Sequence, residues 1–313
     1  MLIAFKTKSS ALFLLLALLF ICSAKDSAAM GLSIAPAAER CGVAEVLVSA
    51  PAAASKRIAS SQAVRGHKDI AWVWLGSPTL RYPHTALGAA THAGSLHVLT
   101  KESAPGAQGR LQEISYELPL NRVFEDRVPR LADMDGDGRD EVIVIESDAI
   151  KGSALVVFGV KAGKLVEIAR SASTGSTFRW LNPVGVADFD GDGKLDIASV
   201  ITPHIGGLLT LYHFKPPALA SYAQAMDVSN HRMGALEQQL AVIVEKPGMR
   251  ATIIVPDMQL KALHALRWEA PGQWKELADV MPLQTTVQRL TPIVGGACLL
   301  LTDKSWWKVQ LNE

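Results

Sequence analysis

The sequence has no surplus of charge of either sign and none of the short motifs that mark common hydrolase and nucleotide-binding sites. Its 31 Lys and Arg residues nearly balance its 30 Asp and Glu residues, which leaves a formal net charge of +1. Proteins that bind nucleic acid or anionic membranes usually carry a clear basic surplus, so we expect no nucleic-acid partner. The sequence contains no GxSxG elbow, no HExxH motif and no cysteine pair at zinc spacing. We therefore assign no catalytic residue.

Histidine clusters are also lacking. The eight His residues are scattered, and even the closest pair, His92 and His97, is five positions apart. Scattered histidines in a β protein usually belong to the surface or the core, so we expect no metal-binding or catalytic role for any of them.

Long apolar runs are absent except near the start of the chain. Lys6 and Lys8 precede the run Ala11–Ile21, which small residues follow up to Ala24. This layout is typical of a secretory signal peptide, which we place at residues 1–24. The run is about half of the roughly 20 residues that a membrane-spanning helix needs. We therefore expect an exported protein, periplasmic or extracellular, without stable insertion in a membrane.

Cysteine is scarce, with three residues in the chain. If Cys22 leaves with the signal peptide, Cys41 and Cys298 remain, one near each end of the mature protein. A disulfide between them would close a very long loop, worth roughly 4 to 5 kcal/mol in the chain-entropy model. Two unpaired, buried thiols are the alternative.

Helical periodicity is almost absent as well. Residues 25–62 are rich in Ala, Ser and Pro and predict a tether with one possible edge strand, Val43–Val48. Residues 63–313 consist of short apolar runs separated by Gly, Pro and polar residues, which predicts an all-β domain. Only Tyr222–Met226 and Asp257–Leu266 are candidates for short helices.

One stretch of the chain occurs twice. LADMDGDGRDEVIVIE at residues 131–146 and VADFDGDGKLDIASVI at residues 186–201 are related by a shift of 55 residues. In both copies an acidic, Gly-rich turn leads into an apolar run, a further Gly turn and a second apolar run. Repeats of this length made of short strands are typical of a β-propeller. We expect five to seven blades; a pair of β-sandwiches is the alternative, but it does not explain the repeated unit.

The repeated turns carry the residues of a metal site. Short acids at every second position of a tightly curled backbone direct several hard oxygens to one centre, which suits Ca²⁺ better than Mg²⁺ or Zn²⁺. We expect about two structural Ca²⁺ ions. The expected ligands are Asp133, Asp135, Asp137, Glu141 and the carbonyl of Arg139 in the first loop, and Asp188, Asp190, Asp192, Asp196 and the carbonyl of Lys194 in the second.

Three other interpretations of these turns are weaker. An EF-hand needs an acid at position 12, where Val144 and Ser199 stand, and a helix afterwards. A nucleotide-binding loop would lack its third glycine, and its acids would repel phosphate. Solvated acidic turns without a metal remain the third alternative.

The pattern DxDGDGxxD leading into a strand, repeated, resembles the FG-GAP or VCBS-type repeats of integrin-α-like β-propellers. The resemblance covers Val128–Val160 and Pro183–Phe214. It implies that the eight carboxylates named above are calcium ligands on loops that connect the blades. Glu141 departs from the usual Asp, and the Phe-Gly and Gly-Ala-Pro signatures that give the repeat its name are not clearly present.

Two functions fit these observations. The first is an exported, calcium-binding propeller that acts as a binding or scaffold module for a protein or a cell-surface glycan. The second is a carbohydrate-binding or carbohydrate-active propeller, a lectin, hydrolase or lyase, for which Glu245 or Asp257 would be the nearest acid outside the loops. Most of the seven Trp residues suit blade packing, and Trp180 and Trp307 are the better candidates for contact with a partner.

Overall fold

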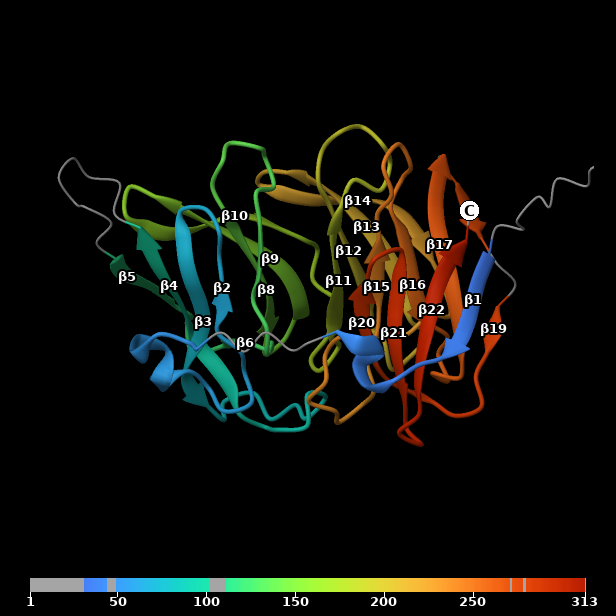
Figure 1. Cartoon of the computed structure of the whole chain (residues 1–313). Coiled ribbons are helices and arrows are strands. Elements are labelled where there is room, and N and C mark those ends of the chain that lie inside the picture. Colours follow the sequence, from blue (N-terminus) through green and yellow to red (C-terminus); the bar gives the residue numbers. More distant parts are fainter. Residues whose placement is uncertain (1–30, 44–48, 102–110, 271, 278–279, 313) are drawn as a thin grey trace, which may run out of the picture.

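The computed structural model describes residues 31–43, 49–101, 111–270, 272–277 and 280–312. Regular structure in these ranges is β-strand apart from two short 3-10 turns, η1 (Glu39–Gly42) and η2 (Ala52–Lys56) (Figure 1). None of the described helices is long and apolar enough to cross a bilayer. The expected signal peptide lies outside the described residues. The described chain is all-β, as the sequence predicts.

Most strands belong to five antiparallel meanders of four strands each. The first contains β2 (Val64–Arg65), β3 (Ile70–Thr79), β4 (His92–Lys101) and β5 (Leu111–Glu117). The second contains β7 (Arg130–Ala132), β8 (Glu141–Asp148), β9 (Gly152–Lys161) and β10 (Lys164–Arg170). The third contains β11 (Leu181–Ala187), β12 (Asp196–Ile201), β13 (Leu208–Lys215) and β14 (Ala218–Ala225). The fourth contains β15 (Val242–Val244), β16 (Thr252–Pro256), β17 (Ala262–Ala270) and β18 (Gln273–Glu276). The fifth contains β20 (Val287–Ile293), β21 (Gly296–Leu301), β22 (Trp306–Asn312) and β1 (Gly31–Pro36).

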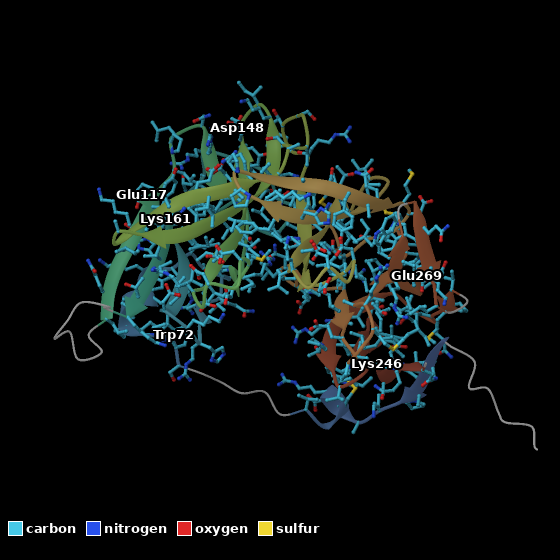
Figure 2. All side chains as sticks on the ribbon, turned by 90° about the horizontal axis from the view of Figure 1, so that it is seen from above. Trp72, Glu117, Asp148, Lys161, Lys246 and Glu269 are labelled. Atoms are coloured by element: carbon cyan, nitrogen blue, oxygen red, sulfur yellow. A yellow bond between two sulfur atoms is a disulfide. The ribbon has the colours of Figure 1, made fainter. Side chains whose placement is uncertain are left out.

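Short contacts link neighbouring meanders. The strand β6 (Arg122–Phe124) pairs with both β4 and β8, and one parallel bridge joins β10 to β14, so the first three meanders form a continuous 13-stranded sheet. The short strand β19 (Met281–Pro282) pairs with β17. Seen from above, the meanders follow one another around an arc (Figure 2).

The core consists of apolar layers between neighbouring meanders. The strand β8 shows how they form, because all eight of its residues are buried and successive side chains point to opposite faces. Val142 and Val144 pack toward the first meander, whereas Ile143 and Ile145 pack toward the third. Similar layers fill the spaces between the third and fourth and between the fourth and fifth meanders. Small sheets that bury both faces against their neighbours in this way are consistent with a β-propeller-like fold.

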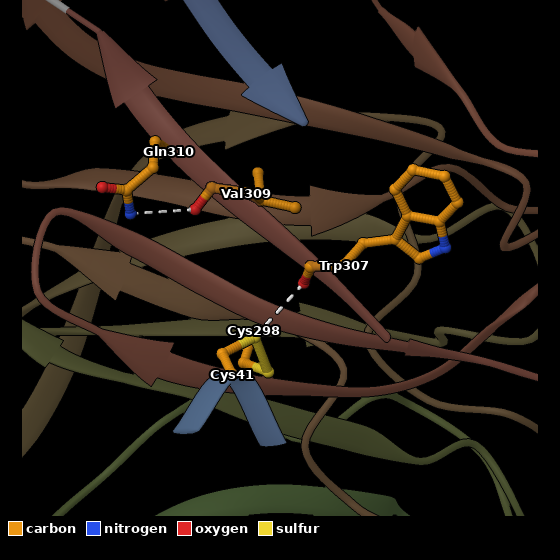
Figure 3. Close-up of a disulfide and its surroundings, with 5 residues drawn as sticks. All are labelled: Cys41, Cys298, Trp307, Val309 and Gln310. Carbon is orange, nitrogen blue, oxygen red and sulfur yellow. Dashed lines mark hydrogen bonds between the residues drawn. A yellow bond between two sulfur atoms is a disulfide. The ribbon is translucent and has the colours of Figure 1, made fainter. Parts of the chain in front are cut away.

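The two ends of the described chain meet in the fifth meander. The strand β1 pairs antiparallel with β22 from Gly31 opposite Asn312 to Pro36 opposite Trp307. A disulfide between Cys41 of η1 and Cys298 of β21 lies next to this pairing (Figure 3). The sequence left open whether these cysteines are bridged, and the structure contains the bridge.

Three segments differ from the sequence expectations. Residues 31–36, which we expected in a tether, form β1 because the exposed edge of β22 offers them a strand partner. The expected edge strand Val43–Val48 lies outside the described residues except for Val43. Both expected helices are wrong. Tyr222 belongs to β14, and in β17 the pair Leu263 and Ala265 faces one apolar layer while Leu266 faces the other, which is the period of a strand.

Candidate metal centre

The two acidic loops occupy equivalent places in the second and third meanders. Residues 133–140 connect β7 to β8, and residues 188–195 connect β11 to β12. Each loop therefore joins two paired strands of one meander, whereas the resemblance implied loops between blades. Gly136 and Gly138 have φ angles of +76° and +87°, and Gly191 and Gly193 have φ angles of +79° and +83°. Only glycine adopts this region readily, so the alternation of acid and glycine sets the curl of both loops.

The same hydrogen bonds recur in the two loops. In the first loop the side chains of Asp133, Asp135 and Asp137 accept hydrogen bonds from the backbone N–H groups of Gly138, Asp137 and Arg139, at 3.0, 3.2 and 2.8 Å. In the second loop Asp188, Asp190 and Asp192 accept the corresponding bonds from Gly193, Asp192 and Lys194, at 2.9, 3.1 and 2.8 Å. The repeat therefore specifies one local structure twice.

In the first loop three of the expected ligands come together. Oxygen atoms of Asp133, Asp135 and Glu141 lie within 4.8 Å of one another, and Asp137 is not part of this group. The carboxylate of Glu141 accepts a hydrogen bond from the N–H of Met134 at 2.8 Å. Burial, together with the charges of the neighbouring acids, raises the pKa of Glu141 to about 7.

One oxygen atom of this group indicates a place for a cation. The Oδ1 atom of Asp133 is buried and has no hydrogen-bond partner, although buried carboxylate oxygens are normally satisfied. A hard divalent cation at the centre of the group would satisfy this atom and offset the repulsion between the three acids. The donor set consists of oxygen atoms alone, which is the set that Ca²⁺ prefers. The residues of the first loop therefore fit the ion.

The second loop brings its ligands together in two overlapping groups. Asp188, Asp190 and Asp192 form one group, and Asp196 joins Asp190 and His213 in another, in each case with ligand atoms within 4.8 Å of one another. Asp196 is almost completely buried. Burial raises the pKa of Asp196 to about 6, although a hydrogen bond from Tyr222 acts in the opposite direction.

The sequence did not reveal His213 as part of this site. Its Nε2 atom lies 2.9 Å from Oδ2 of Asp190. The histidine is 17 residues beyond Asp196 in the chain, and only the pairing of β12 with β13 places the two opposite each other. An acid and a histidine at opposite positions of a predicted hairpin would have indicated this part of the site. Recognising such a pair requires the register of the two strands, which the sequence does not give.

The two loops open on the same side of the molecule. A cavity of about 520 Å³ is lined by Asp133 and Asp135 of the first loop and by Asp192, Asp196 and His213 of the second. A neighbouring cavity of about 370 Å³ is lined by Asp137, Arg139 and Glu141. The guanidinium of Arg139 donates to the carbonyl of Val160 at 2.9 Å, so this side chain is turned away from the loop centre.

A second polar cluster lies at the opposite ends of the strands, near the turn between β8 and β9. His84 donates through Nδ1 to Oε1 of the buried Glu125 at 2.5 Å, and Ser147 donates to Oε2 of the same carboxylate at 2.5 Å. His84 also lines a cleft of about 200 Å³ together with Phe178 and Trp180. Phe178 is 45% exposed, and its ring stacks on that of His84 with 5.2 Å between centroids.

The two tryptophans that the sequence favoured for partner contact are not free surface residues. Trp180 is only 2% exposed and donates a hydrogen bond to the carbonyl of Glu125 at 3.1 Å, so that expectation is wrong for Trp180. Trp307 is half-buried against the core of the fifth meander, and its indole N–H donates to Ser305.

The fold and the loops define a class: an all-β protein of packed antiparallel meanders with repeated acidic loops between strands. Residues 133–199 match the family model of the FG-GAP-like repeat. The resemblance that the two DxDGDGxxD loops indicate is confirmed over this part of the chain. No curated protein matches the chain.

Two solved structures show low similarity. A rhamnogalacturonan lyase, YesW, is similar with a TM-score of 0.33 and 14% identity, over 58% of this chain and 42% of the lyase. A putative phosphatase from Bacteroides thetaiotaomicron is similar with a TM-score of 0.40 and 7% identity, over 81% of this chain and 61% of that chain. The chain thus spans less than two thirds of the length of either protein.

Proposed function

We propose that the chain is an exported, calcium-stabilised β-propeller of five blades that serves as a binding or scaffold module for another protein or a cell-surface component. Each four-stranded meander is one blade, and β1 completes the fifth. In this proposal the mature protein lies in the periplasm or outside the cell. The Cys41–Cys298 disulfide supports export, because such bonds persist in oxidising compartments.

The observation that carries the calcium role is the unsatisfied Oδ1 atom of Asp133 within a group of three carboxylates. Calcium bound there, and at the matching acids of the second loop, would hold β7 to β8 and β11 to β12. Apart from Met134 and Phe189, which pack into the core, the loops consist mainly of exposed or half-buried acids and glycines, so apolar packing leaves their outer parts unsupported. Metal binding therefore couples to folding by mass action.

Thermal unfolding with and without calcium tests this role. We expect chelation by EDTA to lower the midpoint by roughly 5 °C or more and added Ca²⁺ to restore it. Asp133→Asn and Asp188→Asn should each reduce the response to calcium, because each removes charge from one loop. Glu269→Gln is the matched control, since Glu269 is an exposed acid outside the loops. A midpoint that EDTA leaves unchanged would refute structural calcium.

A carbohydrate-binding function is the second candidate, and the cleft beside His84 favours it. An exposed aromatic ring next to hydrogen-bonding side chains is a common way to hold a sugar. Phe178 provides the ring, and His84 and Thr177 line the same cleft. Asp257, one of the acids that the sequence offered for this role, instead caps the backbone N–H groups of Lys261 and Ala262.

A glycan array and a pull-down from the cell envelope, both with and without Ca²⁺, separate the two functions. Sugar binding that Phe178→Ala abolishes, while the calcium response stays intact, would favour the carbohydrate function. Calcium-dependent capture of one defined protein that this variant still binds would favour the scaffold function.

A further inference from the structure

Asp190, Asp196 and His213 form a group of mixed donors beside the second loop. Their ligand atoms lie within 4.8 Å of one another. Asp196 is the first residue of β12, and His213 stands directly opposite it on β13. At the first loop a glycine, Gly159, takes the place of this histidine. It lies beside Glu141, since a Cβ added to Gly159 would lie 4.0 Å from the Glu141 carboxylate. The two loops share one backbone structure but offer different donors.

Tyr222 of β14 holds two of these three side chains in place. Its hydroxyl donates to Oδ2 of Asp196 at 2.7 Å. Its ring lies flat on the imidazole of His213, with 4.0 Å between centroids and 16° between planes. The carboxylate and the imidazole are therefore oriented before any ion binds, which is a known requirement for strong metal sites.

The chemistry of the donors distinguishes this group from a calcium site. Ca²⁺ prefers oxygen ligands, whereas an imidazole nitrogen favours first-row transition metals. Two carboxylates and one imidazole supply three ligands, the number that zinc sites with one open position use. His213, Asp196 and the nearby Asp192 line the cavity of about 520 Å³, so a fourth ligand could enter from it. The hydrogen bond between His213 Nε2 and Asp190 Oδ2, at 2.9 Å, occupies the place that the ion would take.

We propose that Asp190, Asp196 and His213 bind a first-row transition-metal ion, with Zn²⁺ preferred, and that the group of Asp133, Asp135 and Glu141 in the first loop, which has no nitrogen donor, does not. Asp190 and Asp196 also belong to the expected calcium ligands, so the two ions compete at the second loop. The proposal does not depend on the calcium function, because it rests on the mixed donor set alone.

Titration with Co²⁺, a spectroscopic substitute for Zn²⁺, tests the site in the full mature chain after chelator treatment. We expect visible absorption bands that one equivalent of Zn²⁺ removes and that excess Ca²⁺ weakens. His213→Gln should lower the Co²⁺ affinity at least about tenfold. His264→Gln is the matched control, because His264 contacts a single carboxylate, Glu276, at 2.6 Å and belongs to no group of three among the described residues.

A second variant protects the test against misfolding. Tyr222→Phe keeps the stacked ring and removes only the hydrogen bond to Asp196, so the Co²⁺ affinity should fall while circular dichroism stays unchanged. No visible absorption in the wild-type chain, or equal losses in His213→Gln and His264→Gln, would overturn the proposal. The calcium function is judged separately by the thermal response of Asp188→Asn, since Asp188 is outside the mixed group.

Discussion

Lys68 places its ammonium group on Oδ2 of Asp133, the carboxylate that begins the first acidic loop. The hydrogen bond to Asp133 raises the pKa of Lys68, and the same bond lowers the pKa of Asp133. Among the described residues no lysine contacts Asp188, the equivalent residue of the second loop, which accepts backbone N–H bonds from Gly191 and Gly193 at 2.7 and 2.9 Å. The ammonium of Lys68 would therefore compete with a metal ion for Asp133.

The first prediction concerns Lys68→Met. Removing the ammonium should increase the calcium affinity of the first loop roughly two- to fivefold, the range expected for a partly exposed ion pair. The calcium-free protein should become less stable, because Asp133 loses the positive charge of the Lys68 ammonium. Calorimetric titration in an Asp188→Asn background isolates the first loop.

The control for this prediction is Lys164→Met, which removes an exposed lysine of β10 that faces solvent. It should leave the calcium affinity unchanged. Weaker calcium binding in Lys68→Met would contradict the competition and would mean that Lys68 supports the shape of the loop.

The local part of this site could be predicted from the sequence, and the long-range part could not. The hydrogen bonds that Asp133, Asp135 and Asp137 accept from backbone N–H groups come from residues at most five positions away, so the repeated pattern contains all the information they need. Lys68 is 65 residues from Asp133, and its contact depends on the packing of the first meander on the second. His213 likewise meets Asp196 only through strand register.

The same distinction applies to the fold. The strands β8 and β12 are apolar runs that directly follow the acidic, Gly-rich turns, and the sequence alone predicts both of them. The strand β1 has no such signal, since GLSIAP is short and small, and it forms because β22 offers an open edge. A segment such as β1, whose structure depends on a distant partner, carries no signal in its own sequence.

The second prediction concerns the disulfide. The bridge joins residues that are 257 positions apart, and the chain-entropy model gives such a loop about 5 kcal/mol. The double variant Cys41→Ser, Cys298→Ser should unfold at a clearly lower denaturant concentration. Hydrogen exchange should rise first in β1 and β22, because the bridge lies next to their pairing. Equal exchange of these strands in both proteins would contradict a closing role.

The third prediction compares two neighbouring glycines in the turn between β12 and β13. A Cβ at Gly207 would lie 1.7 Å from the carbonyl oxygen of Val228, whereas a Cβ at Gly206 would meet nothing within 4 Å. Both have positive φ angles, of +29° and +79°. Gly206→Ala should therefore cost only the backbone strain, roughly 1 kcal/mol, and Gly207→Ala more than about 3 kcal/mol. Denaturant unfolding measures both, and similar losses would show that the turn moves away from Val228.

The last prediction concerns pH and the pair His204 and His231. The Nε2 atom of His231 donates to the carbonyl of Ala235 at 3.1 Å, so Nδ1 of a neutral His231 accepts from Nε2 of His204 at 2.9 Å. Burial lowers the pKa of His231 to about 3, and burial also lowers the pKa of His204 to about 4. In the unfolded chain both groups titrate near 6.5.

Because the folded pKa values are depressed, the unfolded chain takes up protons first as the pH falls. The neutral pair contributes its full stability above pH 6.5. Below that pH the free energy of unfolding decreases by up to about 1.4 kcal/mol per pH unit for each histidine. The partly exposed His204 contributes less than His231. The free energy of unfolding between pH 8 and 5 should fall less steeply in a His204→Asn, His231→Asn variant, and His67→Asn, an exposed control, should keep the wild-type slope.

Saturating calcium is needed, because the raised pKa values of Glu141 and Asp196 act in the opposite direction when the loops are empty. The decisive quantity is the slope of the free energy of unfolding against pH, because lost packing lowers the stability equally at every pH. An unchanged slope in the double variant would mean that the two histidines are solvated and titrate as they do in the unfolded chain.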